Sequence, residues 1–135
     1  MKDQLTTTLE NSKNYTLAVV NLMPENDYNF KPTEAAWNFR ELVNHIAYGI
    51  GWWQENFIEG NKTEWSPPVA KANSKESVAY LEKAYATLGN TLRKNKMNDE
   101  AVNGFHATLD HITHHRGQLV LYLRCKGITP PDYTY

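Results

Sequence analysis

One apolar stripe constrains the fold of this chain more than any other feature. Its residues recur at alternating intervals of four and three: Phe39, Val43, Ile46, Ile50, Trp53 and Phe57. This spacing places all of these side chains on one face of an α-helix, which has about 3.6 residues per turn. Asn38 followed by Glu41 predicts a capping box at the start of this helix, and residues 60–61, Gly-Asn, predict its end. A helix with such a continuous apolar face needs other helices to cover it.

Three other segments show a helical pattern. The first runs from about residue 2 to residue 23 and is followed by a proline. The next begins at Ser74, a good N-cap, and carries a regular apolar stripe of its own. The last begins at residues 98–99 and ends at about Lys126, where Gly127 predicts a C-cap. No segment has a convincing strand pattern, so the sequence predicts an all-α protein.

The length of the chain limits how these helices can be arranged. A chain of 135 residues is the size of one domain, and we expect a single domain over residues 1–135. Four amphipathic helices of this length are typical of a four-helix bundle. The connector 25–37 between the first two helices is long enough for a crossover, so a simple up-down-up-down order is not required.

Composition excludes several classes of protein. Fourteen Lys and Arg residues against fifteen Asp and Glu residues give a net charge of −1, which argues against a nucleic-acid-binding surface. The longest apolar run, residues 119–123, is far shorter than the roughly 20 residues that cross a membrane. The N-terminus has no hydrophobic signal segment, and the single Cys125 excludes an intrachain disulfide. We therefore expect a cytoplasmic protein without a membrane or nucleic-acid partner.

The histidines of the last helix are not distributed evenly around it. At about 100° per residue, His111 and His115 lie on one flank of the apolar stripe, one helical turn apart. His114 is directed toward solvent, and His106 lies on the opposite flank. Two imidazoles at positions i and i+4 can bind one metal ion together. The pair His111 and His115 is therefore a candidate for a metal site.

A third histidine has a matching position on the second helix. His45 lies on the flank of its own stripe that corresponds, by angle, to the flank of His111 and His115 on the last helix. Gly49 follows one turn later and leaves open space. Three imidazoles would leave coordination positions free for water or substrate, as in catalytic sites. Neutral imidazole suits zinc, nickel, iron or copper. The alternative is that the three histidines share their flanks by chance and that the chain is a helical interaction module.

Neighbouring side chains complete the list of candidates. Six residues on the same flanks are candidates for lining the site or orienting its ligands, and packing between helices explains each equally well: Asn38, Trp52, Asn56, Thr108, Gln118 and Tyr122. Four tryptophans are candidates for shaping an apolar substrate cleft: Trp37, Trp52, Trp53 and Trp65. Arg116 lies near the apolar stripe, so we expect its charged end to reach solvent or to pair with an acidic residue. No residue stands out as a general base.

Two stretches resemble a known family. Residues 110–118, Asp-His-Ile-Thr-His-His-Arg-Gly-Gln, and the segment after them resemble the end of DinB-like proteins. Residues 37–47 resemble the second-helix motif of the same family, and the resemblance covers the whole chain in length and helix order. It implies a DinB/YfiT-like four-helix bundle that holds a divalent metal in a histidine triad. By position, the implied ligands are His45, His111 and His115.

The resemblance also implies a class of activity. Some relatives are thiol S-transferases that use glutathione, mycothiol or bacillithiol. We therefore expect a metal-dependent enzyme, with zinc or nickel, that transfers a low-molecular-weight thiol to an electrophilic small molecule. The alternatives are a metal-dependent hydrolase and a non-catalytic metal-binding stress-response protein. The family also implies a homodimer, and the ordinary histidine pKa implies loss of the metal below about pH 6.

Overall fold

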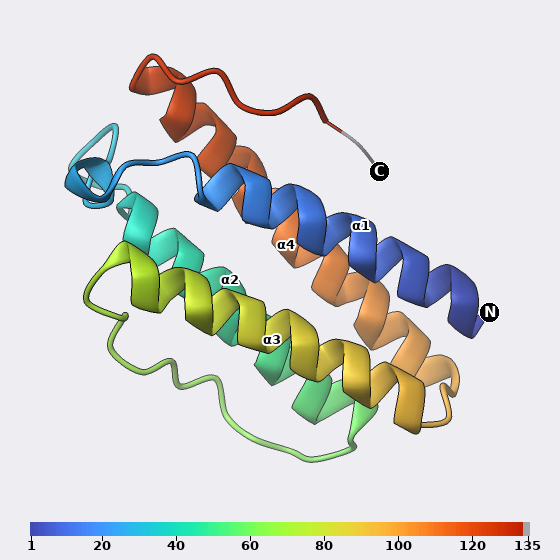
Figure 1. Cartoon of the computed structure of the whole chain (residues 1–135). Coiled ribbons are helices and arrows are strands. Elements are labelled where there is room, and N and C mark those ends of the chain that lie inside the picture. The colour runs from blue at the N-terminus through green and yellow to red at the C-terminus, as the bar shows by residue number, and fades with distance from the viewer. Residues whose placement is uncertain (134–135) are drawn as a thin grey trace.

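The computed structural model describes residues 1–133 and consists of four long helices (Figure 1). They are α1 (Lys2–Val20), α2 (Phe39–Trp53), α3 (Ser74–Lys94) and α4 (Asp99–Cys125). A short 3-10 helix, η1 (Glu25–Asp27), follows α1, and a π-helical turn, η2 (Gln54–Ile58), continues α2. The described residues contain no strand. The predicted all-α four-helix bundle is confirmed.

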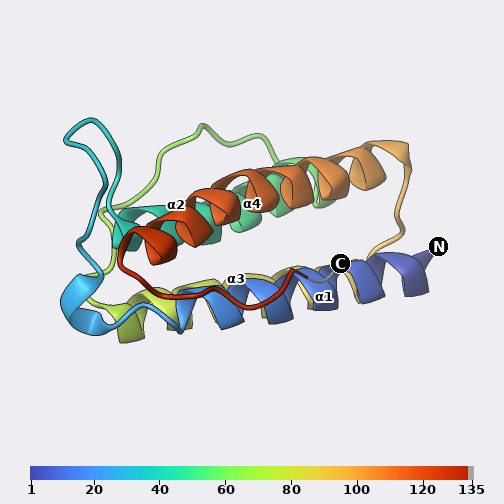
Figure 2. The ribbon, with the colours of Figure 1, turned by 90° about the horizontal axis from the view of Figure 1, so that it is seen from above.

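The helices form two layers, with α2 and α4 in one layer and α1 and α3 in the other (Figure 2). Helices α1 and α4 run in one direction, and α2 and α3 run in the other (Figure 1). The Asn44 amide donates a hydrogen bond of 2.9 Å to the Ser77 hydroxyl, which joins the first parts of α2 and α3. The bundle is therefore not up-down-up-down, because two consecutive helices, α2 and α3, are parallel.

Parallel neighbours require a connection that returns along the bundle, and the segment 59–73 makes this crossover. The backbone N–H groups of the crossover donate hydrogen bonds to side chains on one face of α2 and η2. These side chains are separated from one another by multiples of four residues. These bonds are Lys71 to Asn44 Oδ1 at 2.8 Å, Ser66 to the Tyr48 hydroxyl at 2.8 Å, and Thr63 to Asn56 Oδ1 at 2.7 Å. The crossover therefore follows α2 closely along its length, although its own residues are mostly exposed.

The helix starts follow the capping rules, with one correction. Asn38 and Glu41 form the predicted capping box, with hydrogen bonds of 2.7 and 3.0 Å. The predicted N-cap at Ser74 is wrong by one residue. Asn73 caps α3 by accepting from the Glu76 N–H at 2.8 Å, and Ser74 is the first helical residue. Asparagine and serine are both good N-caps, so the residue type does not decide between adjacent positions.

The helix ends differ more from the sequence predictions. Helix α1 ends at Val20, before the expected residue 23. Helix α4 ends at Cys125, and Gly127 beyond it has a φ of +74°, the left-handed conformation that closes a helix C-terminus. The C-cap residue is Lys126, so the predicted C-cap at Gly127 is one residue too late, although this glycine does close the helix. The Ile128 N–H bonds back to the Leu123 carbonyl at 2.9 Å.

The apolar stripe of α2 is buried as far as Ile50, and then the pattern changes. Trp53 and Phe57, predicted to continue the core, are only half-buried and stack on each other with ring centroids 4.7 Å apart. The π-helical turn explains the difference. In it the Glu59 N–H bonds to the Gln54 carbonyl, five residues earlier, so the turn is wider than an α-helical one and rotates the side chains of this end away from the stripe of α2. In the part of the chain that the structure describes, no helix combines the length and apolar character needed to cross a membrane.

The contact between η2 and α4 gives a test of the packing. A Cβ atom added at Gly104 would lie 2.3 Å from the Phe57 Cβ, whereas one added at Gly117 of the same helix meets nothing within 4 Å. We expect Gly104→Ala to destabilise the protein by about 1–3 kcal/mol, because η2 must move away from α4. Gly117→Ala is the control and should stabilise it by about 0.5–1 kcal/mol. Urea unfolding measures both, and equal effects of the two substitutions would contradict the packing.

Candidate metal centre

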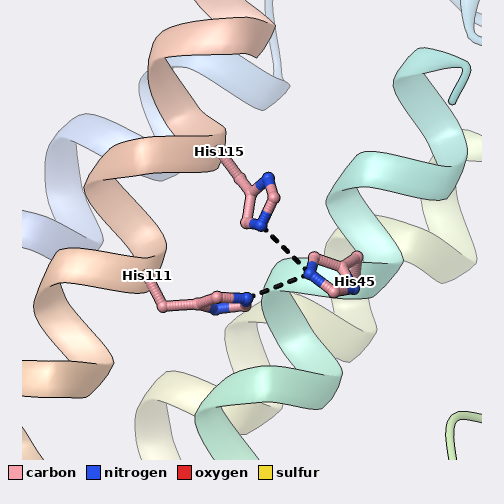
Figure 3. A group of neighbouring side chains, drawn as sticks. All are labelled: His45, His111 and His115. Atoms are coloured by element: carbon pink, nitrogen blue, oxygen red, sulfur yellow. Dashed lines mark hydrogen bonds between the residues drawn. The ribbon is translucent and has the colours of Figure 1, made fainter. Parts of the chain in front are cut away.

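Three histidines meet between α2 and α4 (Figure 3). His45 comes from α2, and His111 and His115 come from successive turns of α4. The Nε2 atom of His45 lies 3.0 Å from that of His111 and 3.1 Å from that of His115. The structure thus brings together the three histidines that the sequence analysis grouped.

The remaining two histidines lie elsewhere. His114 is exposed on α4, as its angular position predicts, and His106, predicted on the opposite flank, is exposed as well. His114 contacts the His115 ring from the solvent side, with centroids 4.7 Å apart. Of the histidine, cysteine and acidic side chains within residues 1–133, only the triad forms a group that could hold a metal ion.

Burial favours the neutral form of the three rings. The pKa of His45 is lowered to about 4, first by burial and then by the charge that His115 would carry. Burial, followed by the neighbouring histidines, likewise lowers the pKa of His111 to about 4. The pKa of His115 is also lowered, mainly by burial, although its hydrogen bond to Gln118 opposes this. Near neutral pH each ring therefore keeps a lone pair, as a metal ligand must.

The ring of His111 fills a space that only a glycine leaves on α2. A Cβ atom at Gly49 would lie 2.5 Å from the His111 Cε1 and 2.7 Å from its Nδ1. The sequence predicts open space at Gly49, and this prediction is wrong in one respect, because the His111 imidazole occupies the space. The absence of a side chain at Gly49 is what allows His111 to reach His45.

A hydrogen bond outside the triad sets the orientation of His115. Its Nδ1 lies 2.8 Å from the Gln118 Oε1, and an amide oxygen only accepts, so Nδ1 carries the proton. The His115 Nε2 consequently presents its lone pair to the other two rings. Gln118, a candidate from the sequence, therefore orients a histidine of the site, in the way that outer hydrogen bonds orient metal ligands.

The donor set fits a transition-metal ion. Without an ion, the His45 Nε2 faces two neighbouring nitrogens but carries at most one proton, and the buried His111 Nδ1 has no hydrogen-bond partner. Nitrogens bound to one tetrahedral zinc ion lie about 3.3 Å apart, for bonds of 2.0–2.1 Å. The two distances from the His45 Nε2, 3.0 and 3.1 Å, are close to this spacing, and all three ligand atoms lie within 4.8 Å of one another. A His cluster of this kind could hold a metal ion, which would take a lone pair from each ring.

Two tryptophans from the connectors flank the triad. The ring centroid of Trp37 lies 4.6 Å from that of His45. The ring centroid of Trp65, in the crossover, lies 5.5 Å from that of His45 in an edge-to-face arrangement. Both indoles are substantially exposed, at 48% and 41%. Trp52 contacts Trp65 but not the histidines, and Trp53 packs on Phe57 instead. Of the four tryptophans considered, Trp37 and Trp65 are thus the ones at the site.

Clefts adjoin the triad on the side of the crossover. One of about 180 Å³ reaches His45 and is lined largely by aromatic rings and prolines, among them Trp37, Tyr48, Pro67, Pro68 and Tyr80. A larger groove of about 950 Å³ lies between α2, α3 and the crossover. The two share Tyr48 and Tyr80 and therefore adjoin each other, and His45 lines the smaller one.

Other candidates from the sequence have structural roles. The Asn56 amide bonds to the crossover, and the Thr108 hydroxyl donates to the Gly104 carbonyl of its own helix at 2.8 Å. Asn38 is fully occupied as a helix cap. The Tyr122 hydroxyl donates to the Trp37 carbonyl at 2.7 Å, and so it helps to position an aromatic ring of the site.

The sequence matches a family model described as the DinB superfamily over residues 8–119. The fold is similar to a crystal structure of a DinB-like protein from Bacillus cereus ATCC 10987, with a TM-score of 0.84, 14% identity, and coverage of 98% of this chain and 97% of that one. It is also similar to a DinB-like protein from Bacillus subtilis, with a TM-score of 0.73, 21% identity and 96% coverage of both chains. No curated protein matches the sequence. Since the family model spans most of its length, the chain belongs to the DinB superfamily.

Proposed function

We propose that this protein binds a divalent metal ion, zinc or nickel, through His45, His111 and His115, and transfers a low-molecular-weight thiol to an electrophilic small molecule. The proposal rests on one observation: ring nitrogens of three histidines from two helices lie within 4.8 Å of one another. Neutral imidazole ligands favour zinc or nickel over calcium or magnesium. Three protein ligands also leave a coordination position for a substrate.

The side chains around the triad support a reaction on a small molecule. When bound, a metal ion lowers the pKa of a thiol or a water molecule that it binds, which supplies a nucleophile near neutral pH. Gln118 orients one ligand, while the Trp37 and Trp65 rings contact the His45 ring. The adjoining aromatic cleft suits the apolar part of an electrophile.

The first prediction concerns metal content. Purified protein is expected to carry about one metal ion per chain, and His45→Ala should lower this content severely, because only two ligands remain. His114→Ala is the matched control, since His114 is exposed next to the site but outside it. Elemental analysis after dialysis measures both. Full metal content in His45→Ala would refute the site.

A second pair of variants leaves all three ligands in place. Gly49→Ala puts a methyl group into the space of the His111 ring, so it should weaken metal binding about tenfold or more. Gly51→Ala, on the same helix with nothing within 4 Å, should bind the metal like the wild type. Competition with a chelator measures the affinities. Equal affinities in the two variants would show that the close approach at Gly49 does not position a ligand.

The histidine pKa values predict how pH affects the metal-free protein. An unfolded histidine has a pKa of about 6.5, above the value of about 4 for His45 and His111 in the folded chain. The unfolded state binds more protons between these values, so the free energy of unfolding should fall as the pH is lowered from 6.5 toward 4. The lowered pKa values also move the expected loss of metal to a lower pH than 6.

Urea unfolding at several pH values tests this prediction. His45→Gln removes one titrating ring, so its stability should depend less on pH than that of the wild type over the same range. Both proteins contain the same carboxylates, which also titrate in acid. The difference between their pH profiles of unfolding free energy therefore reports the contribution of His45. Identical pH profiles would mean that burial does not lower the pKa of His45.

Thiol transfer itself requires a direct assay. The metal-loaded protein should consume glutathione, mycothiol or bacillithiol together with a halogenated aromatic electrophile, and His45→Ala should lose this activity. Mass spectrometry of the thioether product measures the reaction. Inactivity with every thiol, with the metal retained, would reject thiol transfer and favour a hydrolase or a metal-binding protein without turnover.

A further inference from the structure

Arg116 on α4 is a buried cation that the metal centre does not use. It is 5% exposed and faces α1, whereas its neighbour His115 faces α2. From the sequence, we expect the Arg116 guanidinium to reach solvent or to pair with an acidic residue. Both expectations are wrong for the described residues, because the side chain is buried and no carboxylate of residues 1–133 forms an ion pair with it.

The contacts of Arg116 stabilise its charge without neutralising it. Its Nη1 donates to the Thr16 hydroxyl at 3.2 Å, and its Cζ lies 4.8 Å from the Tyr15 ring centroid and 5.6 Å from that of Tyr133. Aromatic faces attract a guanidinium, but they carry no net charge that would neutralise it. A guanidinium has five N–H donors, and the contact to Thr16 uses one of them. A buried charge in this state favours the binding of an anion.

A cavity of about 360 Å³ lies directly beside this guanidinium. It is lined by α4, by Tyr15 of α1 and by residues 129–133, which turn back after α4 (Figure 1). The Tyr15 hydroxyl holds this segment by donating to the Pro131 carbonyl at 3.1 Å. A second cationic residue, Arg124, also lines the cavity. The cavity therefore combines a buried cation, a second cation and enough space for a small ligand.

We propose that this cavity binds a small molecule through an oxyanion group, a carboxylate or a phosphate, with Arg116 as its principal ligand. The planar guanidinium matches the oxygen pairs of both groups and can donate two parallel hydrogen bonds. Asp132 lines the same cavity and is exposed, so it competes with the anion for Arg116 or repels it. The site is on the α1 side of α4 and goes beyond the proposed function of the triad, from which it is independent.

Calorimetric titration of the full metal-loaded chain at low ionic strength tests the proposal, with inorganic phosphate and acetate as separate probes. The wild type is expected to bind at least one of them. Tighter binding of phosphate identifies a phosphate group as the ligand, and tighter binding of acetate identifies a carboxylate. Arg116→Gln should weaken binding about tenfold or more, the effect of losing a charged hydrogen bond.

Three other variants keep the test decisive if Arg116→Gln does not fold. Arg124→Gln should weaken binding about twofold to fivefold, and Asp132→Asn should strengthen it by a similar factor, because each changes one exposed charge at the cavity. His45→Ala should bind the anion like the wild type. The proposal is overturned if neither anion binds the wild type. It is also overturned if a folded Arg116→Gln variant, or both Arg124→Gln and Asp132→Asn, bind the anion as the wild type does. Loss of binding in His45→Ala would overturn it as well, because the anion would then bind at the metal.

Discussion

The close approach of α2 and α4 is the constraint on which the rest of this structure depends. It brings one imidazole from α2 within 3.1 Å of two from α4, at a point where their pKa values are lowered by burial. Two glycines permit this approach, since Gly49 makes room for the His111 ring and Gly104 for Phe57. A larger residue at either position would separate the helices and with them the nitrogen atoms. The distances between the three imidazoles therefore depend directly on how closely α2 and α4 pack.

The crossover between α2 and α3 completes the site from the outside. Because these helices are parallel, the chain must return along the bundle, and it does so over α2 near the triad. Its hydrogen bonds to Asn44, Tyr48 and Asn56 fix its course, and this course places Trp65 against His45. A topological requirement therefore supplies the aromatic surroundings that a solvent-exposed histidine cluster would lack.

Helical periodicity allowed much of this to be predicted from the sequence. The angular positions of His45, His111 and His115 follow from residue spacing alone, as does the exposed position of His114. Spacing describes each helix by itself, however, and says nothing of how connections run. The parallel pair, the course of the crossover and the π-helical turn that displaces Trp53 depend on contacts between distant residues. The surroundings of Arg116 were missed for the same reason, because they come from α1 and the segment after α4.

Helix α4 presents polar groups to both layers of the bundle, and their chemistry differs in a way that burial explains. Toward α2 it offers imidazoles, which lose their charge when buried and then provide lone pairs for a cation. Toward α1 it offers a guanidinium, which keeps its charge when buried and then provides N–H donors for an anion. Adjacent residues, His115 and Arg116, therefore end up with opposite preferences for a ligand. The apolar core residues of α4, such as Ile112 and Leu119, lie between these two faces and keep them separate.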